Sequence, residues 1–349
     1  MIDTNLLKRL CLCNGISGDE KNIRDIIIDE IRDYADEIRV DNLGNLLVYK
    51  KGKKPAKSKL MISAHMDEVG LMVTDITSDG YIKFDEVGGI DRRVLPAKRV
   101  YIGENKVCGV IGLKPVHLTV GDEKSAIPKM NELYIDIGAD SREEALKYVN
   151  YGDSINFSSD FKINGRTVVS KALDDRFGCF VLINLIKMQP EYDMYFTFAV
   201  QEEVGLRGAK TAAYSVNPDF ALVIESTTAA DVPEVDSTHQ VCNLGHGATV
   251  TVMDRCTIYD KELIDAAFEI ADKNDINIQY KRAVAGGNDS GVIHQSRGGV
   301  RTLAVSLPSR YIHAPSSAAN LDDCESVLSL AKLLSDYIAE GNLVKGKEV

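Results

Sequence analysis

Side chains that can bind a metal follow four predicted strands of this 349-residue sequence, at the point where each strand ends. The apolar runs cover residues 60–64, 194–200, 220–224 and 301–307, and the polar residues after them are His65 and Asp67, Glu202 and Glu203, Glu225, and His313. In open α/β sheets, ligands bind in the crevice beyond the carboxyl ends of the strands. We therefore expect these four segments to converge on one site.

A fifth segment, Asp174-Asp175, precedes a predicted helix over residues 176–188. Taken alone, this pair is also explained as a helix cap, because acidic side chains are favoured at the positive end of a helix dipole. Taken singly, His65 has an equally ordinary interpretation as a core histidine, and Glu202-Glu203 as a solvated turn. The recurrence of such residues at four strand ends is what indicates a site.

Two histidines, one aspartate and two glutamates supply the mixed nitrogen and oxygen ligands that Zn, Co or Mn accepts. Two ions that share a bridging carboxylate would use five protein ligands and leave room for a water molecule. Such ions polarise a carbonyl group and make water easier to deprotonate, so the natural reaction is hydrolysis with a spare carboxylate as general base. The adjacent Glu202 and Glu203 can divide these tasks, one binding metal and the other taking the proton.

The elements that would carry these residues alternate between helix and strand after residue 168, which is typical of an α/β sheet. Between residues 69 and 161, by contrast, short β-like runs are separated by Gly and Asp. Strands on both sides of this stretch are needed to complete one sheet. We predict a mixed-sheet α/β/α catalytic domain, formed by residues 1–68 and 162–349, that is interrupted by an all-β, barrel-like insertion of residues 69–161.

Two local patterns lie in the first sixty residues. Ser17-x-x-Glu20 precedes a run of isoleucines at helical spacing and predicts a capping box. Residues 50–59 hold six lysines together with Gly52 and Pro55. We interpret this basic run as a solvated hairpin turn, with an anion-binding patch as the alternative.

Composition excludes several classes of partner. Lys and Arg number 41 and Asp and Glu 52, so the formal net charge is −11 and a nucleic acid would be repelled on average. The seven cysteines show no CxxC spacing, which fits reduced thiols in the cytoplasm. No run reaches the about 18 apolar residues of a membrane span, and no export signal is recognisable. We expect a cytoplasmic protein that has no membrane partner.

The segments around the candidate residues resemble a known enzyme family over nearly the whole chain. They are SAHMDEVG at residues 63–70, KALDDRFG at 171–178, QEEVGLRG at 201–208, Ile224-Glu225, and YIHAP at 311–315. These segments are similar to those of the tetrahedral (TET) or glutamyl aminopeptidases, dinuclear metallo-aminopeptidases that are also called deblocking aminopeptidases.

The resemblance implies two divalent ions per subunit, Zn or Co, with Mn as a further possibility. It implies five ligands, with Asp174 as the bridge, His65 and Glu225 on one ion, and Glu203 and His313 on the other. Glu202 is implied as the general base, and Asp67 as the partner that fixes the imidazole of His65. Many relatives carry Asp in place of Glu225, so the extra methylene here bears on metal spacing.

The implied activity is hydrolysis of N-terminal residues from short peptides, with a metal-bridging hydroxide as nucleophile. The resemblance also implies dimers formed through the β insertion and often a dodecamer. Arg255 is a candidate substrate-binding residue that would favour acidic substrates, with a surface loop position as the alternative.

Three other functions are open to the same residues. A carboxypeptidase or N-acyl amino-acid deacylase would use the same metal core, and a metal-independent glycoside hydrolase would use the paired carboxylates. A non-catalytic assembly protein would keep the fold alone.

Overall fold

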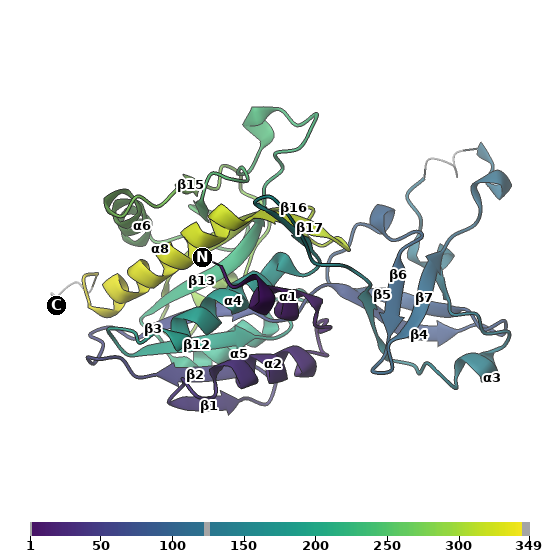
Figure 1. The fold of residues 1–349 in the computed structure, drawn as a ribbon, viewed down its shortest axis with the longest axis horizontal. Coiled ribbons are helices and arrows are strands. Elements are labelled where there is room, and N and C mark those ends of the chain that lie inside the picture. The colour runs from purple at the N-terminus through teal and green to yellow at the C-terminus, as the bar shows by residue number, and fades with distance from the viewer. Residues whose placement is uncertain (1, 122–125, 344–349) are drawn as a thin grey trace.

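The computed structural model describes residues 2–121 and 126–343, and these residues form two parts (Figure 1). The larger part combines a broad sheet with helices. The smaller part, at the right of Figure 1, is built mainly of short strands. The two are joined through the segments that enter and leave the smaller part, next to one edge of the sheet.

One mixed sheet forms the core of the larger part. Its central strands lie in the order β2 (Leu46–Lys50), β12 (Met194–Ala199), β3 (Leu60–His65), β13 (Phe220–Thr228) and β16 (Arg301–Arg310). Strand β3 pairs in parallel with β12 and β13, and β13 pairs in parallel with β16, so the carboxyl ends of these four strands share one edge. The outer strands are β1 (Glu37–Val40), β17 (Ser317–Asn320), β11 (Thr167–Ser170), β10 (Lys162–Asn164), β14 (Ala248–Val250) and β15 (Ile278–Tyr280).

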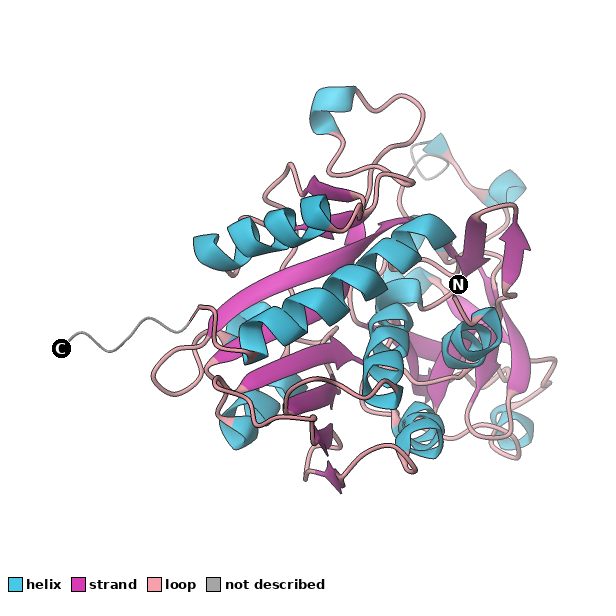
Figure 2. Cartoon of the chain, turned by 60° about the vertical axis from the view of Figure 1, so that its left-hand side comes forward, coloured by secondary structure: helices cyan, strands magenta, loops and turns pink. Residues whose placement is uncertain are grey.

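Helices cover both faces of this sheet (Figure 2). The chain steps from β3 to β12 through α4 (Leu173–Lys187) and back from β12 to β13 through α5 (Arg207–Val216). Right-handed crossovers in opposite directions place α4 and α5 on opposite faces. The remaining helices of this part are α1 (Thr4–Leu12), α2 (Lys21–Ile31), α6 (Lys261–Lys273), α7 (Ser290–Ile293) and α8 (Leu321–Ala339). Among the described residues, none of the helices is both long and apolar enough to cross a membrane.

Burial explains why these segments take the structures they do. Every residue of β3 is buried, as expected for a central strand with helices on both faces. Helix α6 begins where Asp260 accepts hydrogen bonds from the backbone N–H groups of Glu262 and Leu263. Its apolar residues recur at helical spacing and face the core.

The smaller part is a closed barrel with an apolar core of its own. Its strands are β4 (Gly70–Ile76), β5 (Ile82–Val87), β8 (Tyr134–Asp136), β7 (Val107–Gly112), β6 (Arg99–Ile102) and β9 (Ser154–Phe157), given in the order in which they pair, and the short helix α3 (Arg142–Ala145) lies in its final loop. The interior is filled by side chains that include Leu71, Ile82, Ile111, Ile135 and Ile155. An α/β fold interrupted by an all-β barrel is the predicted fold class, and the structure confirms it.

Two local predictions about the sheet are wrong. The lysine-rich loop between β2 and β3 is not a hairpin turn, because β12 pairs with both strands and lies between them. The strand predicted to end at residue 224 continues to Thr228, because its pairing with β16 extends to Thr228 opposite Ser309. Glu225 therefore lies within β13 rather than after it.

The predicted capping box at the start of α2 is also absent. Glu20 occupies the N-cap position, and no side chain makes a cap hydrogen bond there. Ser17 instead hydrogen-bonds Asp67, and Glu20 accepts from Gln201 N as well as from the nearby Gly18 N.

Candidate metal centre

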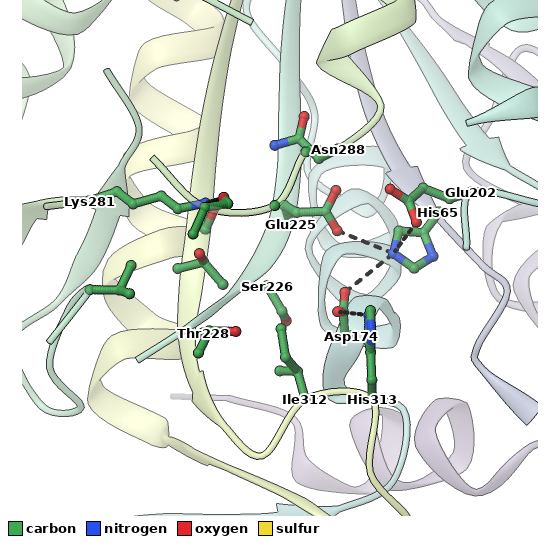
Figure 3. A pocket seen from close by; sticks show the side chains of 16 residues that line it. His65, Asp174, Glu202, Glu225, Ser226, Thr228, Lys281, Asn288, Ile312 and His313 are labelled. Carbon is green, nitrogen blue, oxygen red and sulfur yellow. Dashed lines mark hydrogen bonds and ion pairs between the residues drawn. The ribbon is translucent and has the colours of Figure 1, made fainter. Parts of the chain in front are cut away.

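Acidic and histidine side chains from five segments meet at the carboxyl edge of the sheet (Figure 3). The segments are the end of β3, the first turn of α4, the turn after β12, the middle of β13 and the loop after β16. The side chains that they contribute are His65, Asp174, Glu202 and Glu203, Glu225, and His313. The structure thus brings together every residue that the resemblance assigns to metal ligation, together with the implied base.

Asp174 lies between the two histidines and directs one carboxylate oxygen toward each. Its Oδ1 is 3.3 Å from His65 Nε2, and its Oδ2 is 3.5 Å from His313 Nε2. Glu225 Oε1 lies 3.2 Å from His65 Nε2, and Glu203 Oε2 lies 3.2 Å from His313 Nε2. Two groups of three residues share Asp174, and in each the donor atoms lie within 4.8 Å of one another.

Glu202 lies beside these groups. Its Oε2 is 3.9 Å from His65 Nε2, and its side chain lines the adjoining cavity. A third set of donor atoms within 4.8 Å joins Glu202 to His65 and Glu203. Glu202 is therefore close to the candidate ligands but is not needed to complete either group around Asp174.

The three glutamates of the site are held in conditions that disfavour their negative charge, whereas the two histidines outweigh burial and lower the pKa of Asp174. Burial, reinforced by neighbouring carboxylates, raises the pKa of Glu202 well above its ordinary value and raises the pKa of Glu225 to about 7. The pKa of Glu203 is raised for the same reason. Glu225 Oε2 is buried and has no hydrogen-bond partner among the described residues. A cation would neutralise this charge and satisfy that oxygen, so the donor set fits bound metal.

The surroundings favour the charged form of both histidines. Burial opposes their protonation, but the surrounding carboxylates outweigh burial. These carboxylates raise the pKa of His65 well above its ordinary value and the pKa of His313 to about 11. His65 is 1% exposed and His313 36% exposed, so His313 forms the open side of the site. Without metal, this cluster attracts protons instead.

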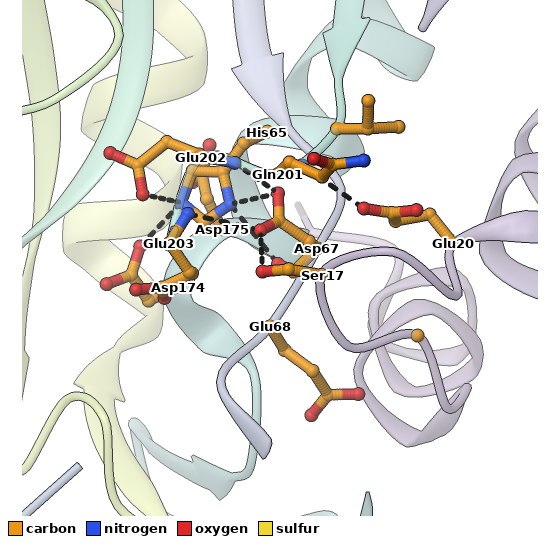
Figure 4. A network of polar contacts seen from close by, with 12 residues as sticks. Ser17, Glu20, His65, Asp67, Glu68, Asp174, Asp175, Gln201, Glu202 and Glu203 are labelled. Atoms are coloured by element: carbon orange, nitrogen blue, oxygen red, sulfur yellow. Dashed lines mark hydrogen bonds and ion pairs between the residues drawn. The ribbon is translucent and has the colours of Figure 1, made fainter. Parts of the chain in front are cut away.

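Asp67 positions the turn that carries Glu202 and Glu203 (Figure 4). Its Oδ1 accepts a hydrogen bond from Glu202 N at 3.0 Å, and its Oδ2 accepts one from Glu203 N at 3.1 Å. Oδ1 is also 3.5 Å from His65 Nδ1. Although burial acts against it, the contact with His65 lowers the pKa of Asp67, so this carboxylate stays ionised. One buried side chain thus touches three residues of the site.

The two adjacent aspartates at the start of α4 have different environments. Asp175 is buried, and its Oδ1 accepts a hydrogen bond from Gly178 N at 3.0 Å, as a helix cap does. Asp174 has φ −86° and ψ 110°, outside the helical region, and its side chain turns toward the histidines. Capping therefore accounts for Asp175 but not for Asp174.

Lys281, which follows β15, lines the cavity on the side away from His65 (Figure 3). Its Nζ donates a hydrogen bond to Ala285 O at 2.8 Å, and no carboxylate of the described residues forms an ion pair with it. Burial lowers the pKa of Lys281, whereas nearby carboxylates oppose that shift. Sequence reasoning missed this residue, and the only available signal was the glycine-rich loop that follows it at residues 286–291.

Arg255 is not among the residues that line this cavity. It is exposed, and its backbone N–H donates a hydrogen bond to Gly286 O at 3.0 Å. Its loop thus contacts a lining residue although the side chain lies outside. A role for Arg255 in substrate binding stays a prediction.

Comparison with known proteins gives matches over nearly the full length. Residues 44–330 match the M42 glutamyl aminopeptidase family. The chain is 33% identical over 348 residues to a lysyl aminopeptidase of Pyrococcus furiosus, which covers 97% of this chain and 98% of that protein.

Two solved structures share the fold at similar identity. A TET aminopeptidase from a marine-sediment Thaumarchaeota archaeon has a TM-score of 0.92 at 34% identity, covering 97% of this chain and 96% of the other. The Pyrococcus horikoshii TET1 peptidase has a TM-score of 0.84 at 37% identity, covering 95% and 98%. That protein can assemble into a tetrahedron or a large octahedral shell.

Proposed function

Because this chain belongs to the M42 glutamyl aminopeptidase family, we propose that it is a dinuclear metal-dependent aminopeptidase that removes N-terminal residues from short peptides. Family membership makes it a peptide hydrolase. The observation that supports the finer proposal is the pair of three-residue groups that share Asp174 at the edge of the cavity. Their histidine and carboxylate donors suit Zn or Co, and also Mn.

In this proposal, His65, Asp174 and Glu225 hold one ion, and Asp174, Glu203 and His313 hold the other. When bound, the ions would supply Lewis acidity to the peptide carbonyl and to a water molecule. Glu202 takes a proton from the attacking water and returns it to the departing amine. Its place beside the ligand groups suits that task, because a general base must lie within reach of the water it deprotonates.

The excess of carboxylates favours an aminopeptidase over the related hydrolases. A peptide presents a positive charge at its N-terminus, and the acidic wall of the cavity attracts that charge. A carboxypeptidase or an N-acyl amino-acid deacylase must instead recognise a carboxylate, for which Lys281 is the available cation. A glycoside hydrolase of the paired-carboxylate kind would have no use for the two histidines.

We assign the preference for the first residue to Lys281. An ammonium group that has no carboxylate partner in the described chain can pair with an acidic side chain of the substrate, and partial burial strengthens that pairing. Arg255 is the second candidate, through its contact with Gly286. Both residues predict a preference for Glu or Asp at the N-terminus.

We also propose that the protein is cytoplasmic and self-associates through its barrel, first to dimers and then to a dodecamer. All seven cysteines are free, which suits a reducing compartment. On the barrel, Val116 is 67% exposed and Leu118 is 57% exposed, and such apolar side chains are favourable at interfaces. The tetrahedral assembly of the related TET1 peptidase supports the same proposal.

The proposed function is tested on chelator-stripped protein to which Zn, Co or Mn is added back. Leucine and glutamate p-nitroanilides report aminopeptidase activity, N-acetyl amino acids report a deacylase, and N-blocked dipeptides report a carboxypeptidase. We expect metal-dependent release of p-nitroaniline from free-amine substrates alone. Cleavage of blocked substrates only, or of a nitrophenyl glycoside without metal, would contradict the proposal.

A further inference from the structure

The segment from Leu10 to Glu20 contacts three loops that carry candidate ligands or the base, namely residues 65–68, 171–176 and 201–203. We propose that Ser17 and Glu20 are positioning residues, which hold the turn that bears Glu202 and Glu203 in its working geometry. This inference builds on the proposed roles of those two glutamates. Residues 10–20 lie outside the stretch that matches the family, residues 44–330.

Ser17 acts through Asp67. Its Oγ donates a hydrogen bond to Asp67 Oδ2 at 2.6 Å, and the same oxygen accepts from Glu203 N (Figure 4). Ser17 and Asp67 are 4% and 0% exposed, so water does not replace this hydrogen bond. Ser17 therefore fixes the orientation of a carboxylate that holds two backbone amides of the turn.

Glu20 acts on the same turn directly. Its Oε1 accepts hydrogen bonds from Gly18 N at 2.7 Å and from Gln201 N at 3.1 Å. Gln201 has φ 56°, in the left-handed region that costs a non-glycine residue energy. That conformation turns the chain out of β12 just before Glu202. The buried carboxylate of Glu20 accepts a hydrogen bond from the backbone N–H of Gln201, next to the two amides that Asp67 holds.

The same segment also binds the loop that carries Asp174. The carbonyl oxygens of Leu10, Cys13 and Gly15 accept hydrogen bonds from the buried guanidinium of Arg176 at 2.7, 2.9 and 3.1 Å. Gly15 O also accepts from Glu68 N at 3.0 Å. A Cβ at residue 15 would lie 2.9 Å from Arg176 Nη2, so a larger residue there would have to displace the guanidinium.

Buried charges complete the connection between the loops. Lys171 Nζ donates to both carboxylate oxygens of Glu68, at 2.6 and 2.8 Å, and Arg176 Nη2 lies 3.4 Å from the same carboxylate. Lys171 and Arg176 bracket Asp174 in the sequence, and Glu68 follows Asp67. These ion pairs join the loops at residues 65–68 and 171–176 to each other, and Arg176 joins both to the segment.

The unused capping positions support this assignment. Ser17 and Glu20 have the spacing of a capping box, yet neither caps α2, and each places its polar atoms on residues of the site. Capping would stabilise one helix end, whereas the observed hydrogen bonds fix the backbone of Gln201, Glu202 and Glu203.

The test compares Ser17→Ala with Ser58→Ala. Ser58 is an equally buried serine whose hydroxyl donates to Ile338 O, and it precedes β3 at the end away from His65. Both variants lose one buried hydrogen bond, so both should show a lower Tm. We expect only Ser17→Ala to lower kcat about 10- to 100-fold, with KM nearly unchanged, and to weaken metal binding about tenfold in calorimetry of stripped protein.

A second pair keeps the test decisive if Ser17→Ala does not fold. Glu20→Gln retains an acceptor oxygen for Gln201 N, whereas Glu20→Met has a similar length without one. We expect kcat near the wild-type value for the glutamine variant and a loss of about tenfold or more for the methionine variant. Equal kcat in this pair, or a Ser17→Ala variant that differs from wild type only in Tm, would overturn the inference. Failure of the wild type to bind metal would instead overturn the proposed function.

Discussion

Replacing Glu202 with glutamine separates proton transfer from metal binding. The substitution keeps the size of the side chain and removes its ability to accept a proton at neutral pH. The turn itself should persist, because Asp67 holds the backbone N–H groups of Glu202 and Glu203 rather than their side chains. Both groups around Asp174 are complete without Glu202, so metal content should be unchanged.

The expected loss falls on kcat. A positioned general base contributes about 10²- to 10⁴-fold to a rate, which corresponds to about 3–5 kcal/mol of activation free energy at 1.36 kcal/mol per factor of ten. The assay measures kcat and KM on an aminoacyl p-nitroanilide, with metal content determined by elemental analysis. Glu203→Gln is the matched control and should lose metal as well as activity.

Two results would refute this reasoning. Turnover by Glu202→Gln within about threefold of wild type would show that another group takes the proton. Loss of metal in Glu202→Gln, with retention in Glu203→Gln, would exchange the two roles.

Three further predictions follow from the contacts of the site. Lys281→Met should lower kcat/KM for glutamyl substrates about 10- to 150-fold and leave leucyl substrates nearly unchanged, because a hydrogen bond to a charged group contributes about 1.5–3 kcal/mol. The same discrimination in Arg255→Met alone would move the role to Arg255. Metal affinity measured by calorimetry should rise with pH through 7, and binding should release protons, because Glu225, with a pKa of about 7, and His313, with a pKa of about 11, must lose protons to bind. A pH-independent affinity between pH 6 and 8 would contradict those pKa values. Asp67→Asn should destabilise the protein by about 1–3 kcal/mol in urea unfolding, because the new amide group would face N–H donors, and should weaken metal binding about 10- to 100-fold. An unchanged metal affinity would show that Asp67 does not position the site.

The sequence predicted the fold class because strand and helix patterns are local. The short β-like runs between residues 69 and 161 do form strands, among them β6 and β9, because their apolar pattern is contained in a few consecutive residues. Strand ends were less predictable where pairing decides them. β13 extends past Glu225 because β16 continues beside it, and no pattern within residues 220–228 shows that.

The residues of the site also fall into those that the sequence indicates and those that only the fold places there. His65 and Glu202 could be found because metal-capable residues at strand ends have few ordinary explanations when several coincide. Lys281 could not be found, because its approach to the cavity depends on how the loop after β15 lies over the sheet. The spacing of Ser17 and Glu20 predicts a helix cap. Nothing in the local sequence shows that Ser17 hydrogen-bonds Asp67 or that Glu20 hydrogen-bonds Gln201.

The most direct test of the account is to locate the ions in crystals of the zinc- or cobalt-loaded protein by anomalous X-ray scattering. The account predicts two peaks, one among His65, Asp174 and Glu225 and the other among Asp174, Glu203 and His313. A single peak, or ions bound elsewhere on the chain, would contradict it.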